Sequence, residues 1–112
     1  MPEEKLGKTS IGMQPNVAAL LSYLLGFITG IIFYVIEKDN KFVRFHAMQS
    51  IVVFGFFMAL QIILGFIPII GWTLMAFIPL IVLILWIILM VKAYQGEKFK
   101  LPIAGDIAEQ NS

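Results

Sequence analysis

The sequence predicts an all-α integral membrane protein, a bundle of three transmembrane helices. Hydrophobic residues make up 60% of the 112 residues and charged residues 13%. Soluble domains average about 45–50% and about 25%. Residues 17–36 and 51–91 carry no charge at all. A soluble domain of this size could not cover so much apolar surface with polar groups, so we expect that surface to face lipid.

The first span is predicted over about residues 17–36, after a flexible tail of residues 1–14. Pro15 and Asn16 are typical of a helix start, with Asn16 as the cap. At about 1.5 Å per residue the stretch reaches roughly 30 Å, the thickness of the hydrocarbon core. Signal-peptide cores are shorter, roughly 7–15 residues, so we expect a retained helix. The polar residues 37–40 end it.

The second and third spans are predicted over about residues 47–67 and 72–92. The uncharged run of residues 51–91 is too long for one span and suits two spans joined by a short hairpin. Pro68 and Gly71 mark the turn between them.

The turns that precede the second span mix charge with apolar residues. We expect Lys41 and Arg44 to reach the headgroups there as interfacial cations, with Asp39 or Asn40 as the helix cap. The three spans together form a membrane domain of residues 15–95.

A short C-terminal tail, residues 96–112, follows that domain. Three spans would place the tail and the loop of residues 37–46 on one side, with six lysines and arginines against two on the other. We therefore expect a multi-pass protein of the cell membrane with its N-terminus outside and its C-terminus in the cytoplasm.

Small residues recur every four positions along the first span, at Ala18, Ser22, Gly26 and Gly30. Such a face lets another backbone approach closely, which contributes much of helix association in lipid. We expect it to pack against a partner helix, which could belong to the same chain, to a second copy or to another membrane protein.

Polar residues share one face of the second span. With 100° per residue, His46, Gln49, Ser50 and Gln61 fall within about a third of the circumference. In a structural interpretation this polar stripe makes hydrogen bonds between helices. In a functional one it lines a wet cavity or holds a ligand. Both remain open at this point.

The composition argues against several classes of function. A net charge of +1 without a basic tract indicates no nucleic-acid partner. With no cysteine and one histidine we expect no metal site, no cofactor and no catalytic residue. No charged residue lies inside a span, so coupled proton transport is not expected either. The chain is predicted not to be an enzyme.

The segment Phe42–Ser50, with its aromatic-His-Ala-x-Gln core, resembles an uncharacterised family of small multi-pass membrane proteins from archaea and bacteria. Asn16, Ser22-Tyr23, the glycines of the first span and the stretch from Gly96 to Leu101-Pro102 also look like that family. The family is distantly similar to the Tic translocon component of the chloroplast inner envelope. The resemblance implies a plasma-membrane protein and, through Tic, a role in protein import.

Three hypotheses for function follow. The first is a structural or accessory protein that associates with itself or with a partner through the first helix. The alternative is a subunit of an oligomeric pore or translocation assembly, because three helices cannot enclose a pore alone. The third is a lipid-binding protein in which cations face anionic headgroups. The cations concerned are Lys41, Arg44, Lys98 and Lys100.

Overall fold

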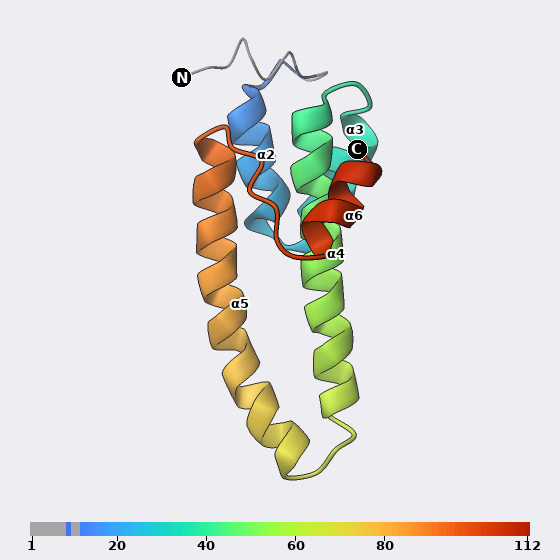
Figure 1. The fold of residues 1–112 in the computed structure, drawn as a ribbon, viewed down its shortest axis with the longest axis vertical. Coiled ribbons are helices and arrows are strands. Elements are labelled where there is room, and N and C mark those ends of the chain that lie inside the picture. Colours follow the sequence, from blue (N-terminus) through green and yellow to red (C-terminus); the bar gives the residue numbers. More distant parts are fainter. Residues whose placement is uncertain (1–8, 10–11) are drawn as a thin grey trace.

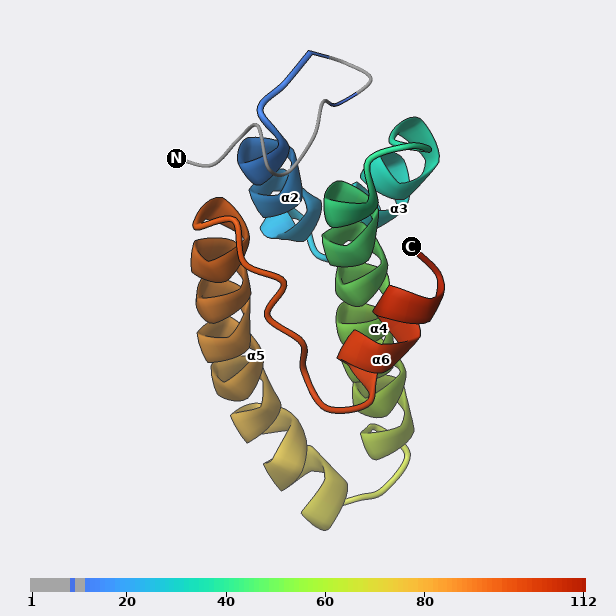
Figure 2. The same cartoon turned by 45° about the horizontal axis from the view of Figure 1, so that its top comes forward.

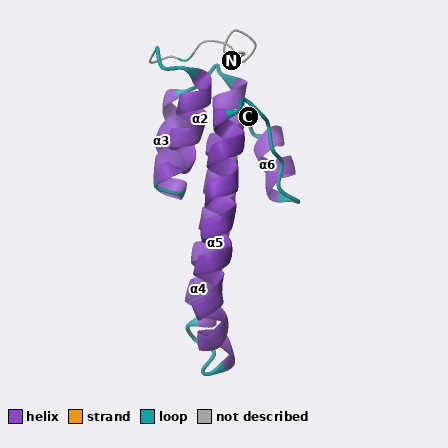
Figure 3. Cartoon of the chain, turned by 90° about the vertical axis from the view of Figure 1, so that its left-hand side faces the viewer, coloured by secondary structure: helices purple, strands orange, loops and turns teal. Residues whose placement is uncertain are grey.

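The computed structural model describes Thr9 and residues 12–112, and these residues form an all-α fold. The predicted tail of residues 1–14 lies mostly outside the described residues. Three short helices surround one end of two long ones (Figures 1 and 3). In chain order the helices are α2 (Pro15–Leu24), α3 (Phe27–Ile36), α4 (Lys41–Leu64), α5 (Ile70–Tyr94) and α6 (Ala104–Gln110).

The predicted first span is wrong as a single helix, because the chain breaks at Leu25 and Gly26. The helices on either side have 10 residues each, too short to cross a bilayer. Gly26 has a φ of +63°, a conformation that favours glycine. Thr29 stabilises the break with its hydroxyl, which donates to Ser22 O at 3.1 Å and accepts from Leu25 N at 3.1 Å.

The two short helices form a hairpin, and the start of α2 and the end of α3 lie at the same end of the molecule (Figure 1). α2 runs antiparallel to α5, since Asn16 donates to Tyr94 O and Trp86 donates to Tyr23 O. α3 then runs back along α4 to the loop of residues 37–40. Asn16 is therefore a cross-helix donor and not the predicted cap, because α2 already begins at Pro15, where a missing N–H costs nothing.

Among the described residues, two helices are long and apolar enough to cross a membrane, so three transmembrane helices are not confirmed. α4 has 24 residues and α5 has 25. The predicted cap at Asn40 is confirmed, since its side chain accepts a hydrogen bond from Val43 N at 3.0 Å. Pro79 lies inside α5 without ending it.

The C-terminal segment folds back over the long helices (Figure 2). Gly96, with a φ of +81°, ends α5, and Glu97 N donates to Lys92 O at 3.0 Å. Residues 97–103, which we call the strap, then run between α5 and α4 towards α6. α6 packs against α4. The predicted tail of residues 96–112 is thus an ordered part of the fold.

One local conformation starts both α5 and α6. Each is preceded by Pro-Ile, at residues 68–69 and 102–103, and the isoleucine has a φ of +67° in both cases. The next N–H bonds back to the proline carbonyl at 2.8 Å and 2.7 Å. A γ-turn of this sign is rare and strained, above all for a β-branched residue.

The molecule has two unlike halves along its length of 51 Å. Around the end that carries Pro15 and the C-terminus, α2, α3, the strap and α6 surround the long helices (Figure 3). At the other end α4 and α5 pack only against each other, and most side chains of the connecting turn are exposed and apolar, such as Phe66 and Ile69. The core and the candidate site belong to the first half.

Candidate functional site

The polar residues at the start of α4 lie beneath the strap. His46, Gln49 and Ser50 have no accessible surface, and neither has Tyr23 of α2, which faces them. The helix period brings the three α4 residues to one side, as the sequence predicted. The unforeseen element is the cover, because α2 and the strap together close this side.

A chain of hydrogen bonds fixes the protonation of His46. Its Nε2 lies 2.8 Å from Glu97 O, which can only accept, so Nε2 carries the proton. Nδ1 is then an acceptor and takes the hydroxyl hydrogen of Tyr23 at 2.7 Å. The Tyr23 oxygen in turn accepts from Gln49 Nε2 at 3.0 Å. The imidazole is a neutral tautomer with both nitrogens bonded.

Gln49 also serves as the main anchor of the strap. Its Nε2 donates to Phe99 O at 2.8 Å, and its Oε1 accepts from Leu101 N at 3.0 Å. One side-chain amide thus satisfies a carbonyl and an N–H of the extended strap, as a neighbouring strand would. Buried backbone groups need such partners.

The small-residue face of the first span packs inside the chain. Ala18 and Ser22 are fully buried, and Gly30 is buried against α4. A Cβ on Gly30 would lie 2.9 Å from Ala47 O, closer than side-chain carbons approach. Ser50 Oγ donates to Gly26 O at 2.8 Å. Gly26 and Gly30 thus meet α4 of the same chain, and Ala18 and Ser22 are buried within the chain as well.

Gln61 is separate from the other three residues of the polar stripe. It lies in the second half of the molecule, where its Nε2 reaches Met75 O at a long 3.4 Å. Its Oε1 is buried and has no partner among the described residues. The stripe therefore divides into three residues that form a site and one that does not.

The interfacial cation Arg44 is occupied by the chain itself. Its guanidinium donates to Tyr34 O at 2.9 Å, to Glu37 O at 3.1 Å and to Ser112 O at 3.1 Å. The same group lies over the Tyr34 ring, 4.0 Å from its centre. Arg44 thus joins the end of α3 to the C-terminus, whereas Lys41 is exposed.

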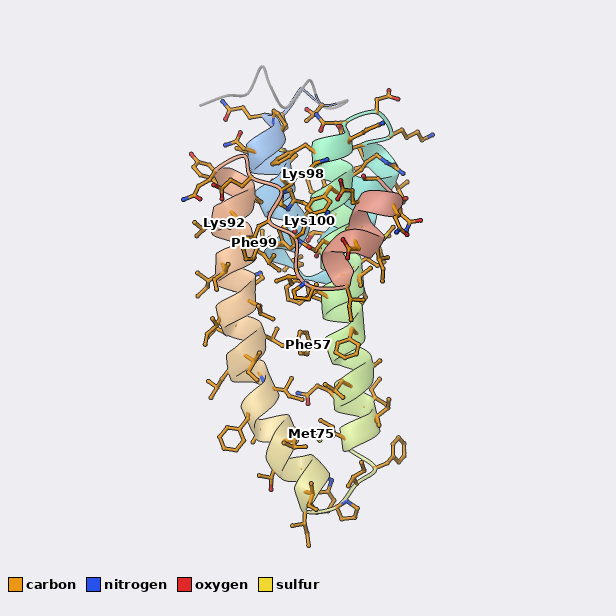
Figure 4. All side chains as sticks on the ribbon, viewed as in Figure 1. Phe57, Met75, Lys92, Lys98, Phe99 and Lys100 are labelled. Carbon is orange, nitrogen blue, oxygen red and sulfur yellow. The ribbon has the colours of Figure 1, made fainter. Side chains whose placement is uncertain are left out.

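Lys98 and Lys100 of the strap lie in the half of the molecule that contains the short helices (Figure 4). Lys100 pairs with Glu109 and, at 3.5 Å, with Asp106 of α6. The hydrogen bond to Glu109 raises the pKa of Lys100 above its ordinary value, and the same bond lowers the pKa of Glu109. The Lys98 ammonium lies 5.5 Å from the centre of the Phe45 ring.

The hydrogen bonds of the site hold α2 and the strap against α4. No three His, Cys, Asp or Glu side chains gather to hold a metal ion in the part of the chain that the structure describes. His46 has no nitrogen left for a ligand. Sequence reasoning did not assign Tyr23, Thr29 or Trp86 to the site. The one indication in the sequence was the predicted packing of the first span against a partner helix.

Comparisons with known proteins agree with a membrane protein. Residues 8–108 match the model of the magnetosome magnetite crystal formation protein family. A UPF0132 membrane protein of Methanocaldococcus jannaschii is 58% identical over 107 residues, 96% of each chain. One of Archaeoglobus fulgidus is 54% identical over 98 residues, 88% of this chain and 95% of its own.

No solved structure matches the chain. The matches confirm the expected kinship with uncharacterised archaeal membrane proteins, and they give no support to a relation with the Tic component. On the evidence of the match over residues 8–108 and of these relatives, the chain belongs to the magnetosome magnetite crystal formation protein family.

Proposed function

We propose that the protein is a structural or accessory protein of the cell membrane and neither an enzyme nor a pore subunit. The sealed polar site carries this proposal. His46, Gln49 and Ser50 are fully buried, and each is bonded within the chain. They leave no polar surface that could line a path for water, which was the feature that favoured a pore.

The proposed topology has two spans and a re-entrant hairpin. α4 and α5 cross the bilayer, while α2 and α3 enter and leave by the same face. Irregular backbone at membrane depth is tolerated where protein covers it. At the hairpin tip, Trp86 and Ser50 donate to the carbonyls of Tyr23 and Gly26, which supports this arrangement.

The charge distribution then favours both termini in the cytoplasm. With a re-entrant hairpin, the chain before Pro15, the loop of residues 37–40 and the C-terminus share one side. All eight lysines and arginines of the sequence belong to these segments and the adjoining helix turns, and none to the turn between α4 and α5. Eight against zero is a stronger bias than the six against two counted for three spans.

Association with a second copy or with another membrane protein stays a prediction. The small-residue face of the first span packs within the chain, so we assign association to the lipid-facing sides of α4 and α5. The family description names magnetite crystal formation. We propose a role within the membrane, carried by the apolar helices α4 and α5.

Cysteine labelling tests the sealed site, since the chain has no cysteine of its own. Ser50→Cys, Gln61→Cys and the exposed Lys38→Cys would each react with a small water-soluble maleimide in open membranes. We expect labelling at Lys38→Cys alone. Reaction at Ser50→Cys and Gln61→Cys as fast as at Lys38→Cys would mean a water path and would restore the pore hypothesis.

Sided labelling tests the topology. Gln14→Cys and Gln110→Cys are exposed positions near the two ends. With a membrane-impermeant maleimide, both should react in inside-out vesicles and neither in intact cells. Reaction of Gln14→Cys in intact cells would contradict the re-entrant hairpin and would support the three-span topology with its N-terminus outside.

A further inference from the structure

An apolar cavity of about 430 Å³ lies below the strap. α4 forms one wall through Val53 and Phe57, α5 contributes Leu85, and Ile103 and Ile107 close it from the C-terminal side. Phe57 projects between the two long helices (Figure 4). The volume falls within the range of about 300–1,000 Å³ that small-molecule sites have. We propose that this cavity binds one acyl chain of a membrane lipid.

The depth of the cavity suits a lipid chain. The headgroup level is marked by Arg44 and by the lysines of the strap. Along α4, Val52 lies eight residues beyond Arg44 and Phe57 thirteen, which corresponds to about 12 Å and about 20 Å. A chain that descends from a headgroup at the level of Arg44 would thus reach the cavity within the hydrocarbon core.

The lining carries no charged or amide side chain, and the cavity is partly open to the outside. The opening is bordered by exposed apolar side chains, with Ile103 76% exposed and Phe56 61% exposed. In the topology proposed above, α4 lies among lipid tails at this depth, and an apolar cavity does not attract water. A lipid chain is therefore the occupant whose chemistry and position both fit.

The strap gives this site a fixed wall. Gln49 holds Leu101, and the turn at Pro102–Ile103 directs the chain into α6. Above the cavity, Lys98 has no carboxylate partner among the described residues, whereas Lys92 and Lys100 do. Lys98 is thus available to a lipid phosphate while the chain occupies the cavity. The site requires α4 and α5 to lie in a bilayer, but not a particular orientation.

Native mass spectrometry of the full chain tests the proposal. The protein would be reconstituted into vesicles of equal parts phosphatidylcholine and phosphatidylglycerol, extracted in mild detergent and washed. We expect one retained lipid per chain. Leu85→Trp and Ala104→Phe fill the cavity from two sides and should abolish retention. Leu83→Trp is the matched control, because it adds the same group at an exposed position of the same helix.

A crosslinking measurement on the unaltered chain decides the matter if a filling variant does not fold. Phosphatidylcholine with a diazirine on its acyl chain should label Phe56, Phe57 or Ile103 above all. No retained lipid, retention by both folded filling variants, or crosslinks spread over the outer faces of α5 would overturn the proposal. So would retention that occurs with phosphatidylglycerol alone, since the headgroup would then be bound and not the chain.

Discussion

Replacing Gln49 by leucine is expected to release the strap from α4. The substitution keeps much of the side-chain volume and removes three hydrogen bonds, two of them to the strap and one to Tyr23. Phe99 O and Leu101 N would lose their partners, while Tyr23 could still donate to His46. The perturbation therefore acts mainly on the strap and on the α6 helix that follows it.

The structure gives the size of this effect in two ways. The two side-chain hydrogen bonds to the strap, at about 0.6 kcal/mol on average and at most about 1.7 kcal/mol each in a membrane protein, sum to about 1–3 kcal/mol. Two buried backbone groups left without partners, at about 1–3 kcal/mol each, give about 2–6 kcal/mol. At 1.4 kcal/mol per factor of ten, 1–3 kcal/mol raises the open fraction of the strap roughly 5- to 140-fold.

Hydrogen exchange followed by mass spectrometry on protein in nanodiscs would measure this change. Peptides from residues 97–112 should exchange faster in Gln49→Leu, while those from α5 should change little. Gln61→Leu is the matched control, because Gln61 makes one long bond and has an unpartnered oxygen, so its loss should leave the strap protected. Unchanged exchange over residues 97–112 in Gln49→Leu would refute the assignment of Gln49 as the anchor.

Three further predictions follow from the backbone and the surface charges. Gly30→Val should lower the thermal midpoint because the added side chain separates α3 from α4. Gly55→Ala, whose Cβ meets open space, should raise stability by about 0.5–1 kcal/mol. Thermal unfolding in detergent compares the two variants. Ile103→Gly relieves a positive φ that costs about 1–3 kcal/mol, and the backbone entropy of glycine offsets about 0.5–1 kcal/mol of this gain. The docked α6 should therefore gain up to about 2 kcal/mol, and slower exchange of α6 amides would show it. Lys100 lowers the pKa of Glu109, so their ion pair stabilises α6 at pH values above the ordinary carboxyl pKa. This stabilisation is lost as the pH falls through the lowered pKa of Glu109. Hydrogen exchange of α6 amides, measured at several pH values, should therefore show α6 loosening in acid but not near pH 7.

The sequence allowed much of α4 and α5 to be predicted. The uncharged run of residues 51–91 and the turn residues Pro68 and Gly71 carry that information locally. The gathering of His46, Gln49 and Ser50 was also predictable, because helix geometry alone brings them to one face. The position of the strap over these residues was not predictable. The strap binds them through backbone groups, which every residue type shares, so the sequence does not identify them.

The break in the first span could not be predicted for a related reason. Twenty apolar residues without proline have the same composition whether they form one helix or two. Gly26 was interpreted as a packing residue, and its close contact with α4 agrees with that. Its positive φ depends on Thr29 nearby and on Ser50 and Trp86, which are distant in sequence.

The isolated first span should therefore behave differently from the same residues in the whole chain. A helix break in lipid exposes backbone groups at two helix ends, each costing several kcal/mol when it has no partner. In a peptide of residues 15–40, Ser50 and Trp86 are absent, and a continuous helix of about 20 residues would satisfy more of these groups internally. We expect solid-state NMR in bilayers to show a helical Gly26 and a transmembrane tilt for the peptide. A break at Gly26 that persists in the peptide would show that the hairpin is encoded locally, and the tertiary explanation of the fold would then be wrong.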